Sequence, residues 1–136
     1  MGHYTGLRVN MILRTDVPQS VRDLLRDMLS HGPKSVAPPD HPLFEAGGRW
    51  EYMLLGTSAY LEPEFTPAST LSDIELFVSF NIKNYGDEIE NFLHWIGPYV
   101  EDCHGGLYRQ EDSVAQLVTW EKGAFFIDGN PVEARK

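Results

Sequence analysis

The chain has very little cysteine, few basic residues and no long apolar run. Cys103 is the single cysteine among 136 residues, so the sequence excludes both an intramolecular disulfide and a multi-cysteine zinc site. No apolar run approaches the roughly 20 residues that a membrane-spanning helix needs. The first residues carry neither the basic nor the apolar region of a signal peptide. We therefore expect a cytoplasmic protein that does not associate with membranes.

Positive charge is scarce relative to negative charge. Lysine and arginine number 11, against 20 aspartate and glutamate residues, which gives a formal net charge of −9. A surface of this sign repels the phosphate backbone, so nucleic acid is not an expected partner. It suits a basic protein partner. The same charge would also serve solubility alone, and the sequence leaves both interpretations open.

Motifs for metal, nucleotide or nucleophilic chemistry are missing. The histidines lack the HExxH spacing of zinc enzymes, and the pairs Gly47-Gly48 and Gly105-Gly106 lack the other residues of a phosphate-binding loop. Glu101 and Asp102 would raise the pKa of the neighbouring Cys103 thiol, whereas a nucleophile needs a lowered one. The sequence predicts no catalytic residue and no cofactor, and it favours a protein without enzymatic activity.

Two strand–helix pairs are well marked. Leu7 to Leu13 alternates apolar and polar residues, and a helix capped at Asp16 or Val17 follows and ends at Gly32-Pro33. Ile74 to Lys83 shows the same alternation over a longer stretch. A second helix begins near Asp87, and its apolar spacing continues through Pro98 to Cys103, which predicts a kinked helix or two short ones.

Four further strands complete the prediction. They span Arg49–Leu55, with Trp50, Tyr52 and Leu54 on one face, Leu107–Glu111, and a hairpin of Val114–Glu121 with Ala124–Ile127. The order matches the split β-α-β (βαββαβ) topology of ferredoxin-like domains with an added C-terminal hairpin. We expect a single α+β domain over residues 1–136, with residues 128–136 forming a loose tail.

Two long loops, residues 33–48 and 56–70, interrupt this small domain. Loops of this length are often functional. Tyr60 and Phe65 in the second loop are candidate binding residues, or they seal the edge of the core. The main hypothesis is a non-enzymatic, acidic protein-binding module. The alternative is a small enzyme or ligand-binding domain whose site lies between these two loops.

The sheet face away from the helices is a second candidate for binding. Ile12 and Phe77 should be apolar neighbours on the two central strands, and charged residues such as Arg8 and Arg14 should surround them. An apolar centre with a charged rim is typical of a contact surface. We expect either the C-terminal hairpin or a second copy of the protein to cover it, and we favour the homodimer.

Glu90 and His94 form an i, i+4 pair on the second predicted helix. Side chains at this spacing are close enough to share a proton or a metal ion. Two ligands make a weak metal site, so an acidic, solvated helix face is the favoured explanation of the pair.

Two stretches show a resemblance to other proteins. Gly2 to Arg8 (GHYTGLR) resembles the beginning of a group of small uncharacterised bacterial and phage proteins, and residues 81–93 resemble a second stretch shared by that group. The resemblance implies a phage or prophage origin, and with it a role against a host protein. It implies no activity, cofactor or catalytic residue.

Overall fold

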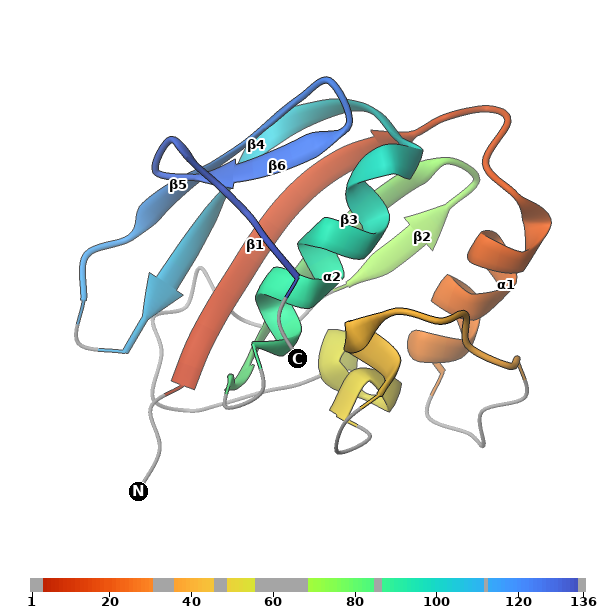
Figure 1. Ribbon diagram of the computed structural model, residues 1–136, viewed down its shortest axis with the longest axis horizontal. Coiled ribbons are helices and arrows are strands. Elements are labelled where there is room, and N and C mark those ends of the chain that lie inside the picture. The colour runs from red at the N-terminus through yellow and green to blue at the C-terminus, as the bar shows by residue number, and fades with distance from the viewer. Residues whose placement is uncertain are drawn as a thin grey trace.

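The computed structural model describes residues 4–30, 36–45, 49–55, 69–84, 87–111 and 113–134. Within these ranges, seven strands form one sheet with the order β2-β3-β1-β4-β5-β6-β7, and each neighbouring pair is antiparallel (Figure 1). The strands are β1 (Tyr4–Leu13), β2 (Thr70–Ser72), β3 (Glu75–Lys83), β4 (Val100–Gln110), β5 (Gln116–Glu121), β6 (Ala124–Ile127) and β7 (Asn130–Pro131). The α-helices are α1 (Gln19–Met28) and α2 (Glu88–Ile96), and short 3-10 turns are η1 (Pro42–Phe44), η2 (Arg49–Glu51), η3 (Met53–Leu55) and η5 (Gly97–Tyr99).

The α+β class is therefore confirmed, with an antiparallel sheet and two α-helices in the described residues. The sheet contains more strands than the predicted set, because β2 and β7 arise from stretches expected to be loop and tail. Neither helix is long and apolar enough to cross a membrane, in the part of the chain that the structure describes.

β1 and β3 pair along their whole length and supply the centre of the core. Their register places Leu7 opposite Phe80, Val9 opposite Val78 and Met11 opposite Leu76. All six of these side chains are fully buried, which confirms the alternation read from the sequence.

α2 lies in front of β1 and β3 (Figure 1) and buries Ile89, Phe92, Leu93 and Ile96. The sheet continues through β5 and β6, and β6 also contacts α2 and η5. Trp120 of β5 donates a hydrogen bond from Nε1 to the carbonyl oxygen of Gly97, at 3.0 Å. The C-terminal hairpin is thus on the helix side of the sheet, and the expectation that it might cover the opposite face is wrong.

The predicted strand Arg49–Leu55 is wrong, because this stretch forms the 3-10 turns η2 and η3. The buried side chains are Trp50, Met53 and Leu54, which have the i, i+3, i+4 spacing of a helical face. Tyr52, expected on the buried face of a strand, is 52% exposed. The outer position next to β3 is taken instead by β2.

The predicted continuation of the second helix to Cys103 is also wrong. α2 ends at Ile96, Pro98 lies in η5, and β4 begins at Val100. Pro98 has no N–H for a continued helix, and β4 gains strand pairing, with Val100 opposite Leu13 and Cys103 opposite Met11. Gly97 is required at the junction, since a Cβ there would lie 2.8 Å from the carbonyl oxygen of Gly123.

The C-terminal hairpin is confirmed, with Lys122-Gly123 at its turn. Both residues have positive φ, as a two-residue hairpin turn of type I′ requires. Asp128-Gly129 repeats this geometry one strand later. Where a loose tail was expected, Asn130–Pro131 pairs with β6, and the Val132 N–H donates to the carbonyl of Phe125.

The first helix is confirmed, although Pro18 occupies the N-cap position in place of Asp16 or Val17. It buries Val21, Leu24, Leu25 and Met28. Its expected end at Gly32-Pro33 lies outside the described residues.

The fold predicts a large loss of stability for Leu76→Asp. Leu76 is fully buried on β3, and an unpaired carboxylate at this position should cost about 4 kcal/mol or more of unfolding free energy. Urea denaturation measures the change. The control is Glu75→Gln on the neighbouring exposed position, which should change stability by less than about 0.5 kcal/mol. Equal midpoints for the two variants would show that the orientation of β3 is wrong.

Candidate functional site

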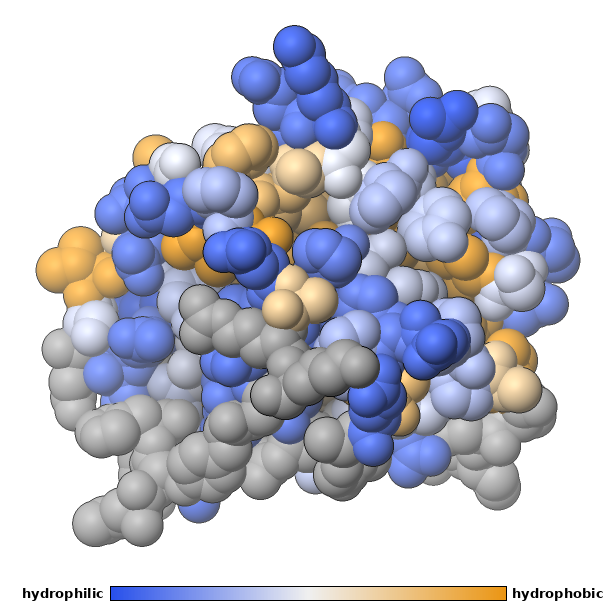
Figure 2. Space-filling model, in the orientation of Figure 1, coloured by the Kyte–Doolittle hydropathy of each residue, from blue (hydrophilic) through white to orange (hydrophobic). Residues whose placement is uncertain are grey.

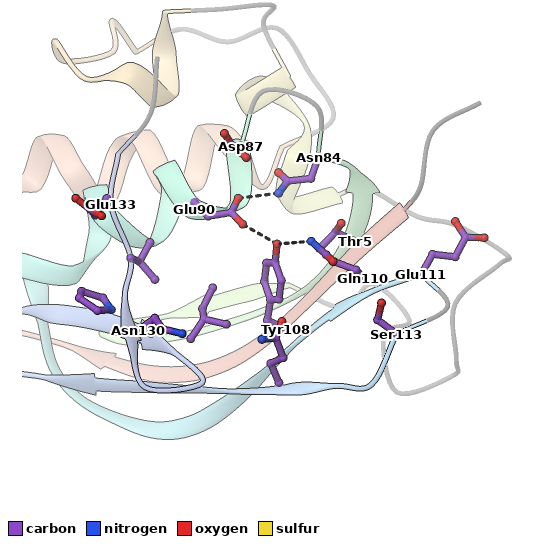
Figure 3. A pocket seen from close by; sticks show the side chains of 14 residues that line it. Thr5, Asn84, Asp87, Glu90, Tyr108, Gln110, Glu111, Ser113, Asn130 and Glu133 are labelled. Atoms are coloured by element: carbon purple, nitrogen blue, oxygen red, sulfur yellow. Dashed lines mark hydrogen bonds between the residues drawn. The ribbon is translucent and has the colours of Figure 1, made fainter.

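A cavity of about 720 Å³ lies between the first turns of α2, the paired ends of β1 and β4, and the C-terminal strands (Figure 3). Its volume is in the range of small-molecule and side-chain binding sites. It is lined by Thr5, Asn84, Asp87, Glu90, Tyr108, Gln110, Glu111, Ser113, Gln116, Ile127, Asn130, Pro131, Val132 and Glu133.

The charged residues of this lining are all acidic. Asp87 and Glu90 at the start of α2, Glu111 after β4 and Glu133 after β7 contribute carboxylates from three separate parts of the chain, and no lysine, arginine or histidine is among the described lining residues. The remaining polar groups are amides and hydroxyls. Carboxylates around one hollow repel each other, and a bound cation would relieve that repulsion.

The carboxylate of Glu90 is held by two hydrogen bonds. Oε2 accepts from the Tyr108 hydroxyl at 2.6 Å, and Oε1 accepts from Nδ2 of Asn84 at 2.7 Å. Tyr108 is almost fully buried. Burial raises the pKa of its hydroxyl, and the Glu90 carboxylate raises it further. The hydroxyl therefore stays protonated at ordinary pH and donates to Glu90.

Local sequence explains why these groups meet. Asn84 follows the last residue of β3, and its Oδ1 accepts from the N–H of Ile89 in the first turn of α2. This contact fixes the start of the helix close to the end of the strand. Tyr108 lies opposite Leu7 on the helix side of the sheet, which directs its ring toward α2 (Figure 3).

The other acidic groups lie at the rim. Glu111 accepts a hydrogen bond from the backbone N–H of Tyr4 through Oε1, at 2.9 Å, and its side chain points away from Tyr108 in Figure 3. Glu133 is exposed and belongs to the segment that follows β7. Ile127, Pro131 and Val132 give this C-terminal wall an apolar surface.

The cavity brings together carboxylate, amide and hydroxyl groups. No group of three or more histidine, cysteine, aspartate or glutamate side chains in the described ranges is placed to hold a metal ion. Because the pKa of Tyr108 is raised well above neutrality, its hydroxyl is poorly matched to proton transfer near neutral pH.

The sheet face that was predicted to bind is the one away from α2 and the acidic cavity. Ile12 lies opposite Glu75 and Phe77 lies opposite Asn10, so Ile12 and Phe77 are diagonal neighbours and both are partly exposed. Arg8 lies beside them opposite Ser79, and its Nε is buried without a hydrogen-bond partner in the described structure.

Arg14, expected among the charged residues around Ile12 and Phe77, pairs with Asp16. Its guanidinium forms an exposed ion pair with Asp16, at 2.8 Å, in the turn after β1. This contact raises the pKa of Arg14 and lowers that of Asp16, chiefly through the hydrogen bond between them. Both groups are exposed, so the pair adds little to stability.

Glu90 and His94 do not share a proton or a ligand in the structure. Glu90 is engaged by Asn84 and Tyr108, whereas His94 contacts His41, with 3.0 Å between Nδ1 of His94 and Nε2 of His41. Cys103 lies on β4 rather than on the helix. It is half-buried, and burial raises the pKa of its thiol.

The loop candidates lie largely outside the described residues. Tyr60 and Phe65 are both outside them, as are parts of the 33–48 loop and nearly all of the 56–70 loop. A site between these loops stays a prediction.

Sequence reasoning missed Tyr108, Asn84 and Glu133 as site residues. Asn84 at a strand end just before a helix is a recognisable capping position, but the pairing of Tyr108 with Glu90 spans 18 residues and depends on where β4 begins. The erroneous extension of α2 hid it.

No family model, no curated protein and no solved structure matches the chain.

The Glu90 network predicts a measurable cost for Tyr108→Phe. The substitution removes a hydrogen bond to a carboxylate in a partly buried setting, which should lower the unfolding free energy by about 1 to 2 kcal/mol. Tyr52→Phe is the control, because Tyr52 is 52% exposed and its loss of a hydroxyl should have little effect. Equal stability of the two variants in urea would show that the Tyr108–Glu90 contact contributes nothing.

Proposed function

We propose that this chain is a non-enzymatic binding module that receives a basic side chain of a protein partner in the acidic cavity. The observation that carries the proposal is the lining itself, in which all charged groups among the described residues are carboxylates. The net charge of −9 adds a long-range field that attracts a basic partner and speeds association.

The size and composition of the cavity support a side chain as its occupant. A volume of about 720 Å³ exceeds that of one lysine or arginine head group, so the alkyl stem can enter as well. Ile127, Pro131 and Val132 offer apolar contacts for that stem, and the carboxylates of Glu90 and Asp87 lie across the cavity on the α2 side. Lysine and arginine combine these same two features.

The surrounding surface supports recognition through polar contacts. Figure 2 shows that hydrophilic residues predominate on this face of the molecule and that hydrophobic residues form separate groups. A surface of this kind resembles the polar rim of a non-obligate interface, where a few buried anchors provide most of the affinity. A basic host protein is the partner that the resemblance to phage proteins would imply.

The strand order supports a more specific fold as part of this proposal. The order β2-β3-β1-β4, with helices α1 and α2 in the two connections, is the order expected of a ferredoxin-like unit. We propose that β5, β6 and β7 are an extension of this unit. The extension supplies the C-terminal wall of the cavity, so the addition to the core fold and the binding site are the same feature.

Binding of a fluorescent arginine- and lysine-rich peptide tests the function. The double variant Asp87→Asn and Glu133→Gln should weaken binding by about fivefold or more, because two carboxylates of the cavity are lost. Asparagine is chosen at position 87 because the residue has positive φ, which asparagine tolerates. Affinity should also fall as salt rises.

The matched control is Glu75→Gln with Glu121→Gln, two exposed positions on strands that change the net charge equally. It should bind the peptide almost as the unmodified protein does. If both double variants lose affinity equally, binding reflects overall charge, and the cavity is not the site.

We also propose a homodimer through the opposite sheet face, which the partial exposure of the diagonal neighbours Ile12 and Phe77 supports. Light scattering at tens of micromolar protein should give the mass of a dimer, and Phe77→Glu should reduce it to that of a monomer. A monomeric mass for the unmodified protein would exclude this arrangement.

A further inference from the structure

His41 and His94 meet at the surface between two elements that are distant in sequence. His41 precedes η1, and His94 lies on the exposed side of α2. Their ring centroids are 5.2 Å apart, and Nε2 of His41 lies 3.0 Å from Nδ1 of His94. This is hydrogen-bond distance, so one nitrogen carries the proton and the other accepts it.

A backbone contact decides which nitrogen carries the proton. Nδ1 of His41 accepts a hydrogen bond from the N–H of Leu43, at 3.0 Å, and therefore carries no proton. Neutral His41 must then be protonated on Nε2, which donates to Nδ1 of His94. The proton of His94 is consequently on its Nε2.

Adding a proton to this pair always breaks a hydrogen bond. A proton on Nδ1 of His41 would face the backbone N–H of Leu43. A proton on Nδ1 of His94 would face the ring Nε2–H of His41. If His41 changes tautomer to accept from a charged His94, its Nδ1 again faces the N–H of Leu43. The paired arrangement thus requires both imidazoles to be neutral.

The charged groups around His41 act in opposite directions. Burial lowers the pKa of His41 most, and His94 on α2 lowers it further, whereas Glu45 and Asp40 on its own segment raise it. Glu90, one helical turn before His94, is already engaged by Asn84 and Tyr108. The result is a lowered pKa, so the paired state is favoured above the ordinary histidine pKa of about 6.5 and is lost as the pH falls below it.

The segment held by this pair forms one wall of a second cavity. Ala37 and Pro39 line an apolar hollow of about 170 Å³ together with Trp95, Tyr99 and residues of α1. The ends of the segment are fixed separately. The Val36 N–H donates to Asp27 of α1, and Phe44 packs edge-on against Trp50 and Trp95. Between these ends, the ring of His41 contacts the ring of His94 on α2.

We propose that the His41–His94 pair is an acid-sensitive latch, which holds residues 37–41 against α2 at neutral pH and releases them when either ring is protonated. Release exposes the apolar cavity beside Trp95. The latch is independent of the acidic cavity and of the basic partner proposed for it.

Nuclear magnetic resonance of the intact protein tests the latch. At pH 7.5, ring nitrogen shifts should show His41 protonated on Nε2 only. Between pH 7.5 and 5.5, the protection of the Leu43 amide from hydrogen exchange, corrected for the intrinsic pH dependence, should fall by about tenfold. His104→Gln is the control, because His104 is an exposed histidine on β4, and this variant should behave as the unmodified protein does.

His94→Ala should remove the dependence, with low Leu43 protection at both pH values. Two results would each overturn the latch: a His41 ring protonated on Nδ1 at pH 7.5, or Leu43 protection that does not change with pH in the unmodified protein. The tautomer measurement needs no variant, so it decides the question even if His94→Ala folds poorly.

Discussion

The burial of one face of α2 against a curved antiparallel sheet is the interaction on which the rest of the structure depends. Ile89, Phe92 and Ile96 are fully buried. The helix lies in front of β1 and β3 (Figure 1), β6 contacts it, and Trp120 of β5 donates a hydrogen bond to Gly97 at its end. The first turn of this helix lies at the open end of the curved sheet. The acidic cavity lies at that end, so the packing of the core also places the site.

A second constraint is the short connection between α2 and β4. Gly97 and Pro98 end the helix and reverse the chain within one 3-10 turn, so that β4 returns antiparallel to β1. This return brings Tyr108 back to the start of α2, where it meets Glu90. The close approach of Gly97 to the hairpin turn at Gly123 ties the same connection to the C-terminal strands. One turn therefore aligns three of the segments that line the cavity.

Charge and hydrogen bonding divide the molecule into regions with different chemistry. In the acidic cavity, Glu90 accepts from two donors and remains a hydrogen-bonded carboxylate, with the other acids nearer the rim. At the opposite end of α2, the two imidazoles of His41 and His94 satisfy each other only while neutral. The same short helix thus carries a hydrogen-bonded carboxylate at its start and a hydrogen-bonded imidazole near its end.

Elements with a strong periodicity could be predicted from the residues alone: β1, β3, the apolar face of α2 and the C-terminal hairpin with its Lys122-Gly123 turn. Strand alternation and helical spacing indicate which face of an element is buried, whichever element packs against it. The end of α2 depends on tertiary contacts, because the apolar spacing of residues 97–103 suits a helix and a buried strand equally and pairing with β1 favours the strand. The tertiary structure likewise decided the turns at residues 49–55 and the cavity, whose carboxylates come from segments far apart in sequence and acquire a common role only when the chain has folded.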